Sequence, residues 1–271
     1  MTSPSAALVL LRASHPGPTV AVTVLAGLLC LGTGAGAGTA ALVVVAVLTG
    51  QLTIGWSNDL VDAERDRAVG RSDKPLASGS LSEERVRTAV RVALLLCVVT
   101  SLALGLVAGL VHLVLLVGSG WAYNLGLKRT AWSWGPYALA FGSLPVVVAL
   151  ATGRDPQAWE AAAGALLGVG AHVLNVLPDL EDDAATGVSG WPHRMGGRRS
   201  RVVAPVLLAA ASVVAVLGPA GSPSTAAWAV LAAVLVAAVV GARGSGRVPF
   251  GVAVAIALVD VVLLVSSRGP A

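Results

Sequence analysis

The chain has 271 residues, of which 56% are apolar and only 12% are charged, and its mean hydropathy is +0.83. This composition excludes an ordinary soluble domain. The net charge of +4 does not indicate a nucleic-acid partner, because the basic residues lie in short loops between long apolar runs. The sequence therefore predicts an all-α polytopic membrane protein whose surroundings are a lipid bilayer.

Nine apolar runs have lengths typical of transmembrane helices. They cover residues 17–33, 38–57, 88–108, 110–127, 131–152, 158–178, 202–218, 225–242 and 248–266. Segments rich in Gly and Pro separate several of them, and a single Gly109 separates the third run from the fourth. We expect nine helices around a central cavity, in one domain that covers residues 1–271.

Lys and Arg gather in alternate loops between these runs. The loops on one side contain Arg65, Arg67, Arg71, Lys74, Arg85, Arg87, Lys128, Arg129, Arg194, Arg198, Arg199, Arg201, Arg243 and Arg247, whereas the opposite loops contain almost only Arg154. The positive-inside rule places the basic side in the cytoplasm. The same rule predicts a cytoplasmic N-terminus and a C-terminus on the other side of the cell membrane.

Two segments of the chain, 58–79 and 175–196, repeat each other at a shift of 117 residues. Ten of the 22 aligned positions are identical without a gap. Such similarity predicts an internal duplication, in which the second and sixth apolar runs hold equivalent places. Both motifs should then lie at the cytoplasmic surface.

Each repeat carries one Asn and two Asp residues at a spacing of four. The rows are Asn58, Asp62 and Asp66, and Asn175, Asp179 and Asp183. Side chains at this spacing stack on one face of a helix, where like charges repel unless a cation lies between them. Two facing rows of oxygen ligands suit Mg²⁺ held together with phosphate oxygens. Simple helix capping would account for one motif, but poorly for two.

Basic and polar residues near these rows predict an anionic ligand, most simply a diphosphate. Arg71 and Lys74 follow the first row, and the stretch "YNLGLKR" places Tyr123, Asn124, Lys128 and Arg129 at the end of the fourth run. Ordinary positive-inside charge is the alternative for Lys128. His172 lies two helical turns before Asp179, where it would line the cavity, assist proton transfer or simply pack. Asp260 is a lone acid in the last run, without an assigned role.

At these motifs the chain resembles the UbiA superfamily of intramembrane prenyltransferases. Asn58, Asp59, Asp62 and Asp66 match the pattern N-D-x-x-D-x-x-x-D, and Asp179 and Asp183 match D-x-x-x-D, with Asn175 before it. "KPLASG" resembles R-P-L-x-S-G with Lys74 in place of Arg, and "YNLGLKR" resembles the family's Tyr…Lys element. Two features depart from the pattern: Pro178 stands where many members have Arg, and "WPHRMG" replaces T-L-P-x-x-x-G.

The resemblance implies nine helices and Mg²⁺-dependent ionisation of an isoprenoid diphosphate, followed by prenyl transfer to a small lipophilic or aromatic acceptor. The implied metal ligands are Asn58, Asp59, Asp62, Asp66, Asn175, Asp179 and Asp183. The implied catalytic residues are Asp62, Asp66, Asp179, Asp183 and Lys128. The implied substrate contacts are Arg65, Lys74, Tyr123, Asn124, Lys128, Arg129 and His172.

Two other functions stay open at this point. A membrane terpene cyclase of the same superfamily would ionise the same substrate without an acceptor. The chain has only two Phe and two Tyr against seven Trp, which predicts against a cavity lined by Phe and Tyr. A cation-coupled transporter would also fit the repeat, but it leaves the basic residues unexplained.

Overall fold

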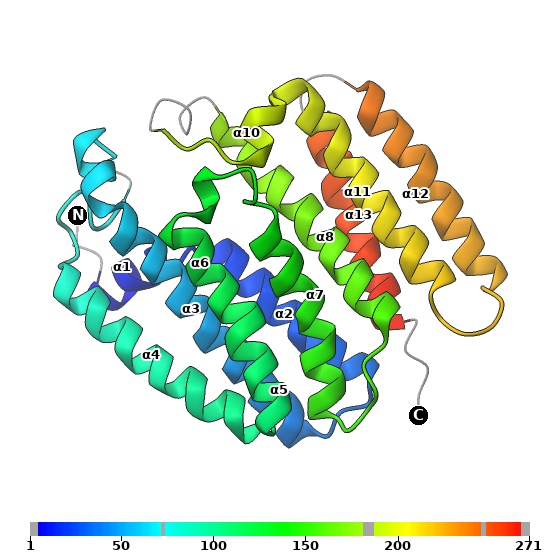
Figure 1. The fold of residues 1–271 in the computed structure, drawn as a ribbon, viewed down its shortest axis with the longest axis horizontal. Helices are drawn as coiled ribbons and strands as arrows, with labels where there is room; N and C mark the ends of the chain where they lie inside the picture. Colours follow the sequence, from blue (N-terminus) through cyan, green and yellow to red (C-terminus); the bar gives the residue numbers. More distant parts are fainter. Residues whose placement is uncertain (1–4, 72–73, 181–186, 245–247, 267–271) are drawn as a thin grey trace.

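The computed structural model describes residues 5–71, 74–180, 187–244 and 248–266, and within these ranges the chain forms helices and no strand. Figure 1 shows the helices packed side by side in one bundle. The helices are α1 (Ala6–Arg12), α2 (Pro16–Gly32), α3 (Ala37–Ala68), α4 (Glu83–Ala103), α5 (Leu106–Val111), the π-helical η1 (His112–Gly118), α6 (Ser119–Leu125), the short η2 (Leu127–Arg129), α7 (Gly135–Ala151), α8 (Ala158–Val176), the short η3 (Leu177–Asp179), α10 (Trp191–Met195), α11 (Gly197–Leu217), α12 (Thr225–Arg243) and α13 (Val248–Ser266).

The described helices make the chain a polytopic membrane protein. Six segments are long and apolar enough to cross a bilayer: α3, α4, the continuous stretch from α5 to α6, α11, α12 and α13. Counting α1 and α2 as one span bent by 75° gives a seventh. A helix also occupies each of the other predicted positions, but α7 has only 17 residues and α8 does not reach the same hydropathy. A count of nine spans therefore stays a prediction.

The first acidic motif lies inside a helix. The predicted apolar run ends at residue 57, but α3 continues through the motif to Ala68. Asp59, Asp62 and Asp66 are all buried on this extension. Cations pair with these carboxylates: Lys74 and His15 with Asp59, Lys128 with Asp62, and Arg65 of the same helix with Asp66. An apolar pattern alone does not reveal this compensation.

The predicted break at Gly109 is wrong. The chain turns at Leu104 and Gly105, and Gly105 has a φ of 107°, a left-handed value that favours glycine. Gly109 instead lies inside α5, where a Cβ would come within 2.5 Å of the Ser101 carbonyl oxygen on α4. The small residue at this position therefore permits close helix packing and does not mark a turn.

Glycines at equivalent places after the two motifs have left-handed φ values. Gly70 and Gly187 have φ values of 72° and 77°, and Gly79 and Gly196 have φ values of 73° and 78°. Each pair is separated by the 117 residues of the sequence repeat. Glycine adopts such left-handed values without a steric penalty.

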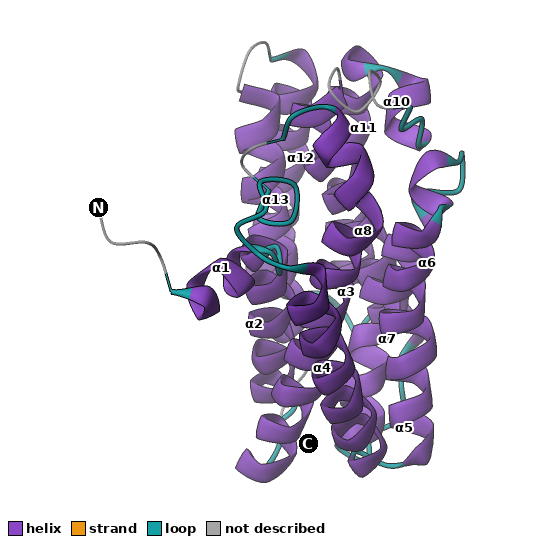
Figure 2. Ribbon diagram, turned by 90° about the vertical axis from the view of Figure 1, so that its left-hand side faces the viewer, coloured by secondary structure: helices purple, strands orange, loops and turns teal. Residues whose placement is uncertain are grey.

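The bend between α1 and α2 is held against α3. A Cβ on Gly55 would overlap the carbonyl oxygen of Ser14, so only glycine permits this approach. Trp56 donates its indole N–H to the carbonyl oxygen of Leu10 at 2.9 Å. Figure 2 shows α1 projecting from the side of the bundle, across the direction of the long helices. The bend places His15, with a left-handed φ of 53°, beside the acidic end of α3.

The opposite end of α2 is held by the last helix. α13 packs against α2 as well as against α8, α11 and α12. At Gly32, a Cβ would come within 2.6 Å of the Val265 carbonyl oxygen. The two ends of α2 therefore rest on different parts of the chain, each through a glycine.

We expect Gly55→Ala to destabilise the protein by about 1–3 kcal/mol, because the added methyl group forces apart backbone that has no room to move. The matched control is Gly38→Ala in the same helix, where a Cβ meets no atom within 4 Å. The measurement is the apparent Tm of the purified protein in detergent. Equal losses of Tm in the two variants would contradict the packing of the bend on α3.

Candidate active site

A cavity of about 650 Å³ opens at the end of the bundle to which α3, α6 and α8 run with their C-termini. Its polar lining residues include His15, Gln51, Asn58, Asp62, Arg65, Asp66, Arg71, Lys74, Asn124, Lys128 and Asn175. Its deeper lining is mostly apolar and includes Val22, Leu116 and Leu144 from α2, η1 and α7, with the polar Gln51 on α3. The cavity thus joins a charged mouth to an apolar interior.

Asp62 is the centre of the charged mouth. Lys128 of η2 donates to both of its carboxylate oxygens, at 2.7 and 2.6 Å, and lies 3.3 Å from the Asn58 side-chain oxygen. Arg65 places Nη2 3.3 Å from Asp62 and 3.5 Å from Asp66. Only 6% of the Lys128 side chain is exposed. Burial lowers the pKa of this ammonium, and the adjacent Asp62 carboxylate opposes the shift.

Asp59 turns toward a second cationic group. Lys74 donates to Asp59 Oδ1 at 2.8 Å, and His15 Nε2 lies 2.9 Å from the same oxygen. His15 Nε2 also lies 3.2 Å from Lys74 Nζ and 3.3 Å from Asn58 Nδ2. The sequence analysis did not identify His15. The available signal was a His before the helix-starting Pro16, but nothing local connects it to Asp59.

Only part of the second acidic row can be placed. α8 ends at Val176 and tightens into the 3₁₀ turn η3, which contains Pro178. Proline lacks an N–H, so it disfavours continuation of the α-helix. Asn175 lines the cavity, whereas the side chain of Asp179 and all of Asp183 lie outside the described residues. Within the described part of the chain, no three His, Cys, Asp or Glu side chains are grouped to hold a metal.

An aromatic wall lies between the mouth and the apolar interior. Tyr123, Tyr137 and Phe141 line the cavity; the tyrosine rings meet edge to face with centroids 5.3 Å apart, and Phe141 stacks at 6.4 Å from Tyr137. These are three of the four Phe and Tyr residues in the chain. The expectation from composition was wrong, because a count does not say where the few aromatic residues gather.

His172 is packed behind this wall. Its ring stacks on Tyr137 with centroids 4.5 Å apart, and Nε2 lies 3.0 Å from Ser133 Oγ. The residue is buried. Of the three alternatives for His172, the structure favours packing, with an indirect influence on the cavity through Tyr137.

Two predicted substrate contacts have other roles in this geometry. Asn124 lines the cavity, but its amide nitrogen donates to the Ile54 carbonyl oxygen at 2.8 Å and lies 2.9 Å from Ser57 Oγ, which fixes α6 to α3. Arg129 is exposed, and its carbonyl oxygen accepts a hydrogen bond from Ser189 at 3.1 Å. Arg129 is not among the cavity-lining side chains.

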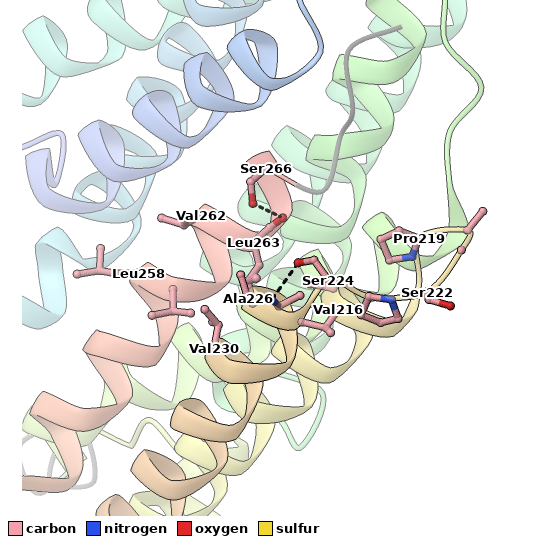
Figure 3. Close-up of a pocket in the computed structure, with 16 residues that line it drawn as sticks. Val216, Pro219, Ser222, Ser224, Ala226, Val230, Leu258, Val262, Leu263 and Ser266 are labelled. Carbon is pink, nitrogen blue, oxygen red and sulfur yellow. Dashed lines mark hydrogen bonds between the residues drawn. The ribbon is translucent and has the colours of Figure 1, made fainter.

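A second cavity of about 610 Å³ lies far from these residues. It is formed by the loop between α11 and α12 together with α12 and α13, and Figure 3 shows its lining. Figure 1 places that loop at the opposite end of the bundle from α10. The lining contains Ser222, Ser224 and Ser266 but no charged side chain, so this cavity lacks the chemistry of the first one.

Comparison with known proteins identifies the family. Residues 20–259 match the UbiA prenyltransferase family, and the chain belongs to that family. Among curated proteins, none is similar enough in sequence to count as a match.

Solved structures share the fold. A UbiA homologue from Archaeoglobus fulgidus, bound to GPP and Mg²⁺, is 15% identical with a TM-score of 0.73, covering 96% of this chain and 99% of that one. An apo UbiA homologue from Aeropyrum pernix K1 is 17% identical with a TM-score of 0.71, covering 90% and 95%. A structure of digeranylgeranylglyceryl phosphate synthase is 17% identical with a TM-score of 0.67, covering 97% of each chain.

The Lys128–Asp62 pair leads to a stability prediction. Lys128→Ala should lower the free energy of unfolding by about 3–5 kcal/mol, because it leaves a buried carboxylate without its closest cation. Adding Asp62→Asn should restore most of the loss, since the charge that needed a partner is then gone. Arg129→Ala, in the same loop but exposed, is the control. Thermal melting of the wild type, the two single variants, the double variant and the Arg129→Ala control measures the coupling, and strictly additive effects of Lys128→Ala and Asp62→Asn would contradict it.

Proposed function

We propose that the chain is a Mg²⁺-dependent intramembrane prenyltransferase that ionises an isoprenoid diphosphate and passes the prenyl group to a small lipophilic or aromatic acceptor. The observation that carries this proposal is the cavity itself, with carboxylates and cations at its mouth, an aromatic wall below them and an apolar interior. A prenyl diphosphate has the same order of polar head, reactive carbon and apolar tail. Family membership gives no support to the transporter alternative.

The mouth fits a divalent cation with a diphosphate. Asn58, Asp62, Asp66 and Asn175 present hard oxygen atoms to one cavity, and Asp179 and Asp183 would add theirs from the second motif. Asp59, whose Oδ2 is buried without a hydrogen bond among the described residues, holds Lys74 in this arrangement. When bound, Mg²⁺ supplies positive charge that stabilises the departing diphosphate.

The basic residues would handle the same anion. Lys128 and Arg65 neutralise Asp62 and Asp66 in the present structure, and Lys74 neutralises Asp59. Each is placed to exchange a carboxylate contact for a phosphate oxygen. As the bond between the allylic carbon and oxygen breaks, the oxygen keeps the electron pair. These cations then stabilise the developing charge where it is greatest.

The aromatic wall would face the carbon that becomes electron-poor. The faces of Tyr123, Tyr137 and Phe141 can stabilise a cation by their quadrupoles, and these partly buried rings would limit the access of water to it. The acceptor supplies an electron pair to the allylic carbon and afterwards loses a proton.

The proposed membrane topology has nine spans with the mouth of the cavity in the cytoplasm. It adds α7 and α8 to the seven segments that meet the length and hydropathy requirement. A shift of 117 residues places α2, α3, α4 and the α5–α6 stretch on α7, α8, α11 and α12. The matched left-handed glycines support this duplication. Because each half has four spans, both halves enter the membrane in the same direction, and the positive-inside rule assigns the basic ends to the cytoplasm.

The metal-site assignment predicts that Asp62→Ala and Asp179→Ala each abolish Mg²⁺-dependent diphosphate release. Both variants remove an oxygen ligand from a site with strict octahedral preference. Arg199→Ala, an exposed basic residue on α11, is the control and should retain full activity. Release is measured with purified protein in nanodiscs across a Mg²⁺ titration. Full activity of either Asp variant would remove that residue from the site.

A terpene cyclase is the second candidate, because the aromatic wall would also suit a cation quenched by the substrate's own double bonds. Incubation with Mg²⁺ and prenyl diphosphates of several lengths, without an acceptor, separates the two functions. We expect little organic product until an acceptor is added, since a transferase needs the acceptor's electron pair. Rapid formation of a cyclic hydrocarbon or alcohol, detected by mass spectrometry, would instead identify the cyclase.

A further inference from the structure

We propose that the cavity selects short prenyl chains, and that Val22, Leu116 and Leu144 form a floor that limits the tail to about two isoprene units. This inference rests on the proposed function, because it describes which isoprenoid diphosphate the same cavity accepts. The floor residues come from α2, η1 and α7, three helices that meet below the aromatic wall.

The depth of the apolar part follows from the helices that line it. On α3, cavity-lining residues continue from Asn58 at the mouth down to Gln51, a polar residue at the deep end of a largely apolar wall; these seven residues make about 10 Å of helix. On α7, they continue from Pro136 to Leu144, eight residues, which is about 12 Å. The lining residues of α3 and of α7 therefore give similar depths for the space below the charged mouth of the cavity.

The residues one turn below this level leave no further room. Val47 on α3, Ala26 on α2 and Val148 on α7 are each 0% exposed, and each lies four residues deeper than a lining residue of its own helix. They belong to the same apolar cluster as the three floor residues. A close-packed interior of this kind does not admit another group without displacing side chains.

The tail of a prenyl diphosphate can be compared with that depth. Each isoprene unit adds four carbon–carbon bonds, or roughly 5 Å when extended, from a projected length of about 1.2 Å per bond. A pocket of 10–12 Å thus holds two units. The length of this pocket, and not the total cavity volume of about 650 Å³, sets the limit, so an extended third unit would press against Leu116 and Leu144.

The test measures binding, so that it does not depend on the unidentified acceptor. Prenyl thiolodiphosphates of five, ten, fifteen and twenty carbons, which resist ionisation, are titrated with Mg²⁺ into the full-length protein in nanodiscs by calorimetry. We expect the ten-carbon compound to bind most tightly. Affinity should fall on the order of tenfold or more with the third unit, as expected for a pocket that lacks room for added carbons.

Variants of the floor and wall make the assignment specific. Leu144→Ala and, independently, Leu116→Ala should move the preference to fifteen carbons, because each shortens a side chain at the floor. Ala140→Leu, which fills the cavity from its wall without creating a void, should move the preference to five carbons. Leu139→Ala, on the half-exposed outer face of α7, should keep the wild-type order.

The possible outcomes distinguish a failure of the chain-length proposal from a failure of the proposed function. Equal affinity of the wild type for ten and twenty carbons would overturn the floor and show that the tail leaves between helices into lipid. An unchanged order of affinities in Ala140→Leu and in both floor variants would also overturn it. If no thiolodiphosphate of any length binds in the presence of Mg²⁺, the proposed function itself fails.

Discussion

Carboxylates beside an apolar interior require cations at the same depth. The arrangement of the segments at the charged end of the bundle, which the proposed topology places in the cytoplasm, follows from that requirement. An isolated acid in a helix within a membrane costs about 2.5–3.5 kcal/mol on insertion scales. α3 carries three buried acids in two turns. Cationic partners come from separate segments: Lys128 from the turn after α6, Lys74 from the loop after α3, and His15 from the bend before α2. These ion pairs therefore join segments whose contact no local sequence pattern predicts. Arg65 joins this network from α3 itself.

Polarity is ordered along a single direction in the cavity. The ion pairs lie at its mouth, the rings of Tyr123, Tyr137 and Phe141 line its wall, and Leu116 and Leu144 form its proposed floor. An amphiphilic substrate can satisfy all three zones in only one orientation. In the proposed arrangement, the position of the reactive carbon depends on two contacts, that of the diphosphate with the mouth and that of the end of the prenyl tail with the floor. This double constraint explains why a change at either end would alter the reaction between them.

Local pattern was sufficient for the features that depend on short stretches of chain. Four-residue spacing predicted the stacked Asn58, Asp62 and Asp66, because a helix fixes neighbours one turn apart whatever surrounds it. The role of His15 could not be predicted, since its contact with Asp59 spans 44 residues and depends on a glycine that admits the bend. Gly109 was taken for a turn because sequence alone does not distinguish a left-handed glycine from one that permits close packing. The second acidic row stays a prediction from the repeat.

Glycine contacts near the two ends of α2 fix that helix at both ends of the bundle. Near its start, Gly55 admits the carbonyl of Ser14, and at its end Gly32 rests on the backbone of Val265 in the last helix. Between these fixed points, α2 contributes Val22 to the cavity lining. A fusion, truncation or antibody fragment that strains the final turn of α13 would therefore tilt one wall of the cavity. The last turn of α13 thus offers an external handle on the proposed enclosed reaction.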